Sequence, residues 1–199
     1  MKNNIVTSKK PAFLSKKDTN YLIGDWCLSD KILKYKYKYK NLKDYGDDKK
    51  KIEKKLSFLF KIYIKILKNF AVALNKYHNV KLSERYWETL ISRWLWHFLM
   101  FTHDRWEIVK KLKKVNGNFY NKVDNYDEKI FIKKNTRSFI HNSHTPEWNS
   151  WIYSKILGCY HKFEIIKTNI YIKKVKKKRE ESMKFLKIIF SLKIIIKYL

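Results

Sequence analysis

The sequence is poor in the residues that make tight turns, with four glycines and two prolines among 199 residues. It contains neither a glycine-rich P-loop nor a G-x-G-x-x-G dinucleotide fingerprint, which excludes the common nucleotide-binding loops. No run of about 20 apolar residues occurs, so no transmembrane helix is predicted, and residues 1–14 lack the apolar centre of a signal peptide. Only two cysteines occur, Cys27 and Cys159, without metal-like or redox-like spacing, which favours reduced thiols in the cytoplasm.

Acidic residues are also few: 46 lysines and arginines stand against 18 aspartates and glutamates, for a net charge of +28. The lysines are spread over the whole chain and accompany abundant isoleucine, asparagine and tyrosine, a joint excess typical of AT-rich coding. Such a bias places lysine at solvated positions without building a patch, so specific nucleic-acid binding is not expected. Hydrophobic residues make up 45% and aromatic residues 17%, which predicts a folded domain with a core.

A first strand is predicted in the stretch NYLIGDWCLS. Its apolar residues 21–23 read as a buried strand that ends in a tight turn at Gly24. Asp25, Trp26 and Cys27 then follow the carboxyl end of the strand, which is where open α/β sheets bind their ligands.

Other strand patterns are shorter. The alternating residues 34–40, KYKYKYK, fit either an edge strand guarded by lysines or low-complexity sequence. The polar residues 116–128, with an Asn-Gly pair at their start, predict a loop. Residues 129–133, KIFIK, fit a short strand after it.

Three helices are predicted from apolar periodicity and capping residues. The first covers residues 56–78 and is preceded by Asp47 and Asp48, which suit a helix start. A break over residues 79–82 leads to Ser83, the expected N-cap of the second helix. Its buried face is predicted to contain Leu90, Ile91, Trp94, Leu95, Phe98, Phe101, Ile108, Val109 and Leu112, and that of the first helix Leu56, Phe60, Tyr63, Ile64, Leu67, Phe70, Ala71 and Leu74.

The third helix has the clearest ends. Thr145 is its expected N-cap, Pro146 its first residue and Gly158 its terminator.

The second helix holds an unusual stretch, residues 85–106, with three of the five arginines and four of the seven tryptophans of the chain. Opposite its apolar face, a stripe is predicted that contains Tyr86, Arg93, His97 and Asp104, with Arg85, Ser92, Trp96 and His103 along its edge. Arginine binds carboxylate or phosphate through two parallel donors, and tryptophan offers a flat face on which sugar rings and cations dock. The stripe fits equally an ion network inside the fold and a ligand site.

Other chemical motifs are weaker. His141 and His144, with Cys159 and His161, are ligand types without a recognised zinc spacing, so no metal site is predicted. His78 lies at a helix end, where it can satisfy the last carbonyls. No Ser/His/Asp or Cys/His nucleophile arrangement can be identified.

Five ordered motifs carry a family resemblance. They are IGDWC (23–27), YGDDKKK (45–51), ALNKYHNVKLSERYWETLISRWLWHF (73–98), HDRW (103–106) and EWNSWIYSKIL (147–157). Over residues 13–160 the chain resembles the N-terminal part of a family of transferases encoded in bacterial O-antigen and surface-polysaccharide gene clusters. The matching positions are Gly24, Asp25, Trp26, Cys27, Asn75, His78, Arg85, Tyr86, Trp87, Trp94, Asp104, Arg105, Trp106, Trp148 and Asn149.

The resemblance implies an α/β, helix-dominated fold similar to the N-terminal Rossmann-like half of a GT-B glycosyltransferase, with two long antiparallel helices against a small sheet. We expect an N-terminal segment (1–19), a transferase-like domain (20–162) and a Lys/Ile-rich tail (163–199). The tail fits an amphipathic helix on an acidic membrane, an added core helix, or a truncated or frameshifted end. Nothing resembles a donor-binding half, so activity of this chain by itself is left open.

The candidate site combines the resemblance with side-chain chemistry. Asp25 is the candidate general base, with His97 and Asp104 as further catalytic candidates. The candidate substrate-binding residues are Gly24, Trp26, Cys27, His78, Arg85, Tyr86, Arg93, Arg105 and Trp106.

The predicted function is sugar transfer in surface-polysaccharide synthesis. The resemblance implies a nucleotide-activated sugar as donor, a lipid-linked glycan as acceptor and no other cofactor. The protein is expected in the cytoplasm, with peripheral contact to an anionic inner membrane. The alternatives are a basic, non-enzymatic binding protein for nucleic acid or anionic membrane, and a non-functional remnant of a transferase.

Overall fold

The computed structural model describes residues 2–24, 27, 37–42, 48–131 and 133–172. Their central feature is a five-stranded sheet in the order β3-β2-β1-β4-β5, in which every neighbouring pair is parallel. The strands are β1 (Asn3–Val6), β2 (Thr19–Leu22), β3 (Tyr39–Asn41), β4 (Phe119–Tyr126) and β5 (Phe163–Ile172). A parallel sheet with helical connections confirms the predicted α/β class, with helices dominating.

The strand predictions succeed in part. β2 includes Tyr21 and Leu22 of the predicted strand, and β3 includes Tyr39 and Lys40 of the alternating segment. Residues 34–36 of that segment lie outside the described residues. The patterns did not predict β1 and β5, and both lie outside residues 20–162, the range expected for the domain.

The predicted loop over residues 116–128 is wrong beyond its first residues. Gly117 does form a turn, with a φ of 118°, but β4 begins two residues later and pairs with both β1 and β5. Asn121 and Asp124 in β4 are buried and hydrogen-bonded, so their polarity does not indicate exposure.

The predicted strand over residues 129–133 is also wrong. The chain forms a 3-10 helix, η3 (Glu128–Phe131), instead. The Asp127 side chain accepts the Lys129 N–H at 3.1 Å and its carbonyl accepts the Ile130 N–H at 3.0 Å, which closes the turn. Phe131 then stacks on Trp151, with ring centroids 4.9 Å apart.

Two helices of 30 residues each, α2 (Lys49–His78) and α3 (Glu84–Lys113), form a hairpin. Contacts run antiparallel along it, because the start of α2 meets the middle of α3 and the end of α2 meets the start of α3. Asp48 caps α2, which begins seven residues before the predicted start at residue 56. Asn79 ends α2 in the left-handed region, with a φ of 54°, and Ser83 caps α3 as predicted.

The predicted buried faces of these helices are partly wrong. Phe60 in α2 is 56% exposed and Leu90 in α3 is 59% exposed. The buried residues of α2 are Leu59, Ile62, Tyr63, Ile66, Leu67, Phe70, Ala71 and Leu74, and those of α3 are Trp87, Leu95, Phe98, Leu99, Thr102, His103, Val109 and Leu112. Each helix must bury one side against its partner and another against the rest of the core. A single apolar stripe does not reveal that combined orientation.

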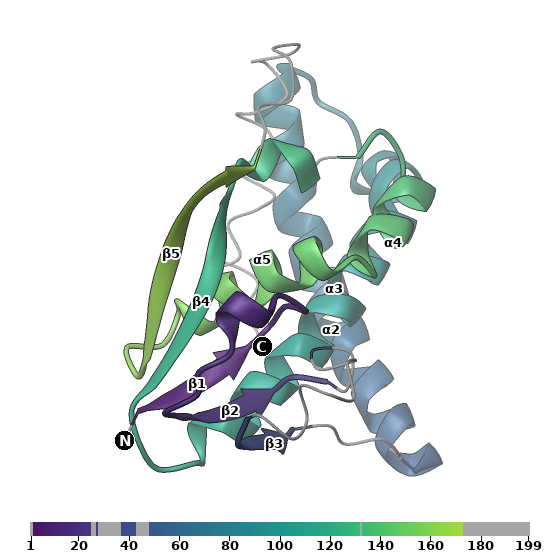
Figure 1. Cartoon of the computed structure of the whole chain (residues 1–199). Coiled ribbons are helices and arrows are strands. Elements are labelled where there is room, and N and C mark those ends of the chain that lie inside the picture. The colour runs from purple at the N-terminus through teal and green to yellow at the C-terminus, as the bar shows by residue number, and fades with distance from the viewer. Residues whose placement is uncertain (1, 25–26, 28–36, 43–47, 132, 173–199) are drawn as a thin grey trace.

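Two shorter helices connect β4 to β5. The first, α4 (Thr136–Ser143), was not predicted, and the second, α5 (Pro146–Leu157), has the predicted Thr145 N-cap and ends at Gly158. α5 packs against β4 and β5, and α3 packs against α5 (Figure 1). α4 packs against α3 and α5.

The sheet is covered on both faces near β1. The Asn4 side chain donates to the Phe13 carbonyl of η1 (Pro11–Phe13) at 2.6 Å. Thr7 is an odd number of residues from Asn4, so its side chain points to the opposite face of the sheet, where it contacts Ser150 of α5. The described part of the chain contains no helix whose length and hydropathy would let it cross a membrane.

Candidate functional site

The carboxyl ends of β1 and β4 meet where the strand order reverses, since β2 and β3 extend to one side and β4 and β5 to the other. Open α/β sheets form a ligand crevice at this position. Thr7, Ser8 and Lys10 follow β1 there, and Asp124 lies near the end of β4. Thr7, Ser8 and Asp124 are buried, so this edge of the sheet is polar and enclosed.

Asp124 is a buried carboxylate surrounded by donors. Lys10 forms an ion pair with it, and the hydroxyls of Tyr126 and Thr168 each donate to it at 3.1 Å. Burial, with the nearby carboxylate, raises the pKa of the Tyr126 phenol above its usual value, so the phenol stays a donor. These bonds join the β1–β2 connection to β4 and β5.

A second polar group lies on the helical side of the same edge. The Asn121 amide donates to the Ile5 carbonyl at 2.8 Å and to the Thr7 hydroxyl at 3.2 Å. The Thr7 and Ser150 hydroxyls are 3.3 Å apart. The Asn121 side-chain oxygen is buried without a partner among the described residues, so this edge retains a free acceptor.

Gly24 and Cys27 lie where the sequence predicted, after the carboxyl end of β2. The Cys27 N–H donates to the Gly24 carbonyl at 3.0 Å, and the Cys27 thiol donates to the Val6 carbonyl at 3.3 Å. Cys27 is buried. Asp25 and Trp26, the candidate base and its neighbour, lie outside the described residues.

Arg105 is held by protein acceptors. Its guanidinium donates twice to the Asn149 side-chain oxygen, at 2.9 and 3.1 Å, and once to the Phe101 carbonyl at 3.2 Å. It also lies over the rings of Phe101 and Trp148, and burial lowers its pKa from the usual value. The structure therefore gives Arg105 and Asn149, both at family-motif positions, the role of joining α3 to α5.

The residues around the α2–α3 turn also hold the fold together. The Asn75 amide bonds both the N–H and the carbonyl of Leu82, at 3.0 and 2.8 Å, and accepts the Trp87 indole N–H at 2.9 Å. His78 stacks on Trp87 with ring centroids 5.7 Å apart. The motif positions Asn75, His78 and Trp87 of the stretch 73–98 thus form one structural contact.

Arg85 and Tyr86, at the start of α3, are exposed. Tyr86 makes an edge contact with Trp87. Among the described residues no ion pair involves Arg85, and it lines neither of the pockets beside α3.

The predicted stripe along α3 is not one site. Asp104 follows Arg93 by eleven residues, which places it roughly 16 Å farther along the helix at about 1.5 Å per residue. Asp104 forms an ion pair with Lys55 of α2, and Trp106 donates its indole N–H to the Tyr160 hydroxyl at 2.9 Å.

Arg93 and His97 lie together in the first half of α3. His97 Nδ1 is 2.6 Å from the Arg93 carbonyl oxygen, and because a carbonyl only accepts, Nδ1 carries the hydrogen. In the neutral imidazole the other ring nitrogen is then an acceptor, as a base requires.

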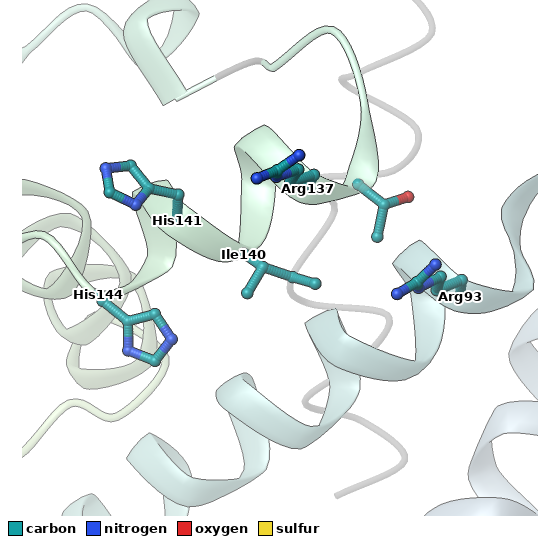
Figure 2. A pocket seen from close by; sticks show the side chains of 6 residues that line it. Arg93, Arg137, Ile140, His141 and His144 are labelled. Atoms are coloured by element: carbon teal, nitrogen blue, oxygen red, sulfur yellow. The ribbon is translucent and has the colours of Figure 1, made fainter.

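A cationic pocket of about 500 Å³ lies between α3 and α4. Its lining residues include Arg93 from α3 and Arg137, Ile140 and His141 of α4, with His144 just after the end of that helix (Figure 2). The sequence patterns missed Arg137. Arginine was already the informative residue in this lysine-rich chain, and Arg137 is one of only five.

The residues considered as metal ligands do not all lie together. His141 and His144 line this pocket, while the Cys159 thiol is exposed and donates to the Lys155 carbonyl at 3.3 Å. Within the described ranges, no three His, Cys, Asp or Glu side chains gather in a way that could hold a metal ion.

Comparison with known proteins places the chain in a family. The model of the LIC12162 family transferase matches residues 3–198, which extends the relationship beyond the motif-bearing residues 13–160 at both ends. No curated protein and no solved structure matches the chain. Because the match covers nearly all of the sequence, the chain belongs to the LIC12162 family of transferases.

Proposed function

We propose that this protein transfers sugars in the synthesis of a bacterial surface polysaccharide, and that it corresponds to the N-terminal region of a GT-B-like enzyme. The observation that carries the proposal is the polar carboxyl edge of a parallel sheet at its reversal of strand order. Membership of a transferase family and the ordered motifs of the sequence support it.

The proposed reaction needs a base. Asp25 comes three residues after the end of β2 in the sequence, and it takes the proton from an acceptor hydroxyl. The hydroxyl oxygen then bonds to the anomeric carbon of the activated sugar, and the bond from that carbon to the nucleoside diphosphate breaks. Trp26 offers a face for a sugar ring, and His97 is the alternative base.

The proposed acceptor is a lipid-linked glycan, and the proposed location is the cytoplasmic surface of the inner membrane. The net charge of +28 supports contact with anionic lipid headgroups, which attract lysine-rich surfaces. The lysines of α2 supply part of that charge, since many of them are exposed.

The test is nucleoside-diphosphate release from a panel of nucleotide sugars, with and without lipid extract as acceptor source. We expect release by the unmodified chain and a loss of at least about 100-fold in Asp25→Asn, since a general base contributes about that much. Glu53→Gln, an exposed change on α2, is the matched control and should retain activity.

Two outcomes decide against parts of the proposal. Unchanged turnover in Asp25→Asn excludes Asp25 as the base. No release from any donor, together with binding to anionic vesicles or nucleic acid that falls steeply with salt, supports the alternative of a basic binding protein.

A further inference from the structure

The pocket between α3 and α4 has the composition of an anion site. Its lining consists of Arg93, Thr136, Arg137, Ile140, His141 and His144, so four of the six side chains are arginine or histidine and none is a carboxylate. Two of the five arginines of the chain therefore converge on one cavity from two different helices (Figure 2).

Neither arginine is used by the fold. No ion pair in the described part of the chain involves Arg93 or Arg137, whereas Arg105 donates to three protein acceptors. Both side chains are exposed. A planar guanidinium that is not held by the protein is suited to bind phosphoryl oxygens in pairs.

The backbone beneath the pocket is firmly held. Phe139 of α4 is buried and packs against Trp94, Phe98 and Phe101 of α3, with ring centroids 5.9 to 6.2 Å apart. Asn135 caps α4 through the Ser138 N–H at 2.9 Å. The start of α4, which carries Arg137, is therefore fixed relative to Arg93, and its free N–H groups add to the positive field.

Arg93 also lines a second recess, of about 330 Å³, between α2 and α3. Its other lining residues are Phe60, Tyr63, Glu88, Ser92 and Trp96. The Tyr63 hydroxyl donates to Glu88 at 3.4 Å, and the ring of Tyr63 meets Trp96 edge to face at 6.0 Å. Aromatic faces beside a carboxylate and a hydroxyl are the groups that bind the apolar face and the hydroxyls of a sugar.

We propose that the two recesses bind one phosphorylated sugar, with its phosphate or diphosphate between Arg93 and Arg137 and its ring in the aromatic recess. Arg93 lines both recesses, so a ligand bound to its guanidinium can reach into each. The cationic pocket has the size of a ligand site, since such pockets hold about 300 to 1,000 Å³. That this ligand is the activated substrate rests on the proposed function; its binding does not.

The site is tested by calorimetric titration of the whole chain with inorganic pyrophosphate, with a panel of sugar 1-phosphates and with the free sugars. We expect the double variant Arg93→Gln with Arg137→Gln to bind pyrophosphate and the sugar 1-phosphates at least about tenfold more weakly, because charge-assisted hydrogen bonds are lost. Glu88→Gln should weaken the binding of the sugar 1-phosphates and leave the binding of pyrophosphate unchanged. Arg93→Lys keeps the charge but not the paired donors, so this variant should bind the phosphorylated ligands more weakly than the unmodified chain does.

The matched control is Lys65→Gln with Lys68→Gln, which removes the same charge from exposed positions of α2. Equal loss in this control shows attraction to net charge and overturns the site, as does an absence of pyrophosphate binding. Tight binding to phosphatidylglycerol vesicles that depends on Arg93 and Arg137, without sugar-phosphate binding, assigns the phosphate to a lipid headgroup and overturns the sugar part.

The same variants separate this site from the proposed function. Pyrophosphate binding that depends on Arg93 and Arg137, without release from any nucleotide sugar, leaves the site standing and rejects the transfer reaction. Transfer with an unchanged KM in the double variant rejects the site and leaves the function. Both arginines lack partners in the described structure, so we expect these variants to fold, which circular dichroism checks.

Discussion

Arg105 illustrates a motif residue whose side chain serves the fold. Its guanidinium binds the Asn149 oxygen through two N–H groups, a geometry that lysine cannot reproduce. We expect Arg105→Lys to lower the free energy of unfolding by roughly 1 to 3 kcal/mol in urea denaturation.

Arg85→Lys is the control, because Arg85 is exposed on the same helix, and it should change stability little. Preserved stability in Arg105→Lys, combined with weaker ligand binding, would instead return Arg105 to the substrate-binding role that the sequence predicted.

His103 is a buried histidine between Phe58 and Trp106. Burial, followed by the charge of Lys55, lowers its pKa below the ordinary value of 6.5. The unfolded chain therefore takes up a proton near pH 6.5 that folded His103 resists, so this contribution to stability is present above pH 6.5 and is lost as the pH falls below it. We expect urea unfolding to show lower stability at pH 5.5 than at pH 7.5.

His103→Phe should flatten that pH dependence, whatever its effect on absolute stability. An identical slope in the variant and the unmodified chain would assign the pH dependence to other groups.

At the scale of elements, the α2–α3 hairpin depends on Asn75. This side chain makes two bonds to Leu82 and one to the Trp87 indole. Asn75→Ala leaves the indole N–H without its acceptor, and we expect a loss of roughly 1 to 3 kcal/mol in the free energy of unfolding, measured in urea. Lys76→Ala, its exposed neighbour, should be close to neutral, and equal losses in the two variants would contradict the role of Asn75.

α2, α3 and α5 could be predicted from the sequence because their end signals are local. Ser83 and Thr145 act within a few residues of their own positions, and the structure places both at helix starts. The strands could not be predicted equally well, because their polar residues are satisfied by distant partners. Asp124, for example, is paired with Lys10, which lies 114 residues away.

The candidate site was predictable only in part for the same reason. Helical periodicity correctly groups Arg93 with His97, which bonds the Arg93 carbonyl. It also groups Arg93 with Asp104, because periodicity gives only the angle of a side chain around the helix axis. It does not show that the two residues lie far apart along that axis. Arg137 joins Arg93 only because α4 packs on α3 through Phe139, a tertiary contact with no local signal.

For the whole molecule, the parallel sheet and the helices provide two kinds of polar surface. The sheet edge between β1 and β4 is polar and enclosed, while α4 carries the exposed arginine pocket. An enzyme that transfers an activated sugar needs a position for the acceptor and groups that bind the charged leaving group.

The net charge of +28 lowers the stability of the whole molecule through self-repulsion. The described ion pairs engage only a small share of the lysines, so most positive charges repel one another. We expect raising NaCl from 20 to 300 mM to increase Tm, because the added salt shortens the screening length. Binding of chloride in the arginine pocket would also raise Tm. Screening predicts an equal increase in the double variant Arg93→Gln with Arg137→Gln, whereas site binding predicts a smaller one. A Tm that does not change with salt would contradict both.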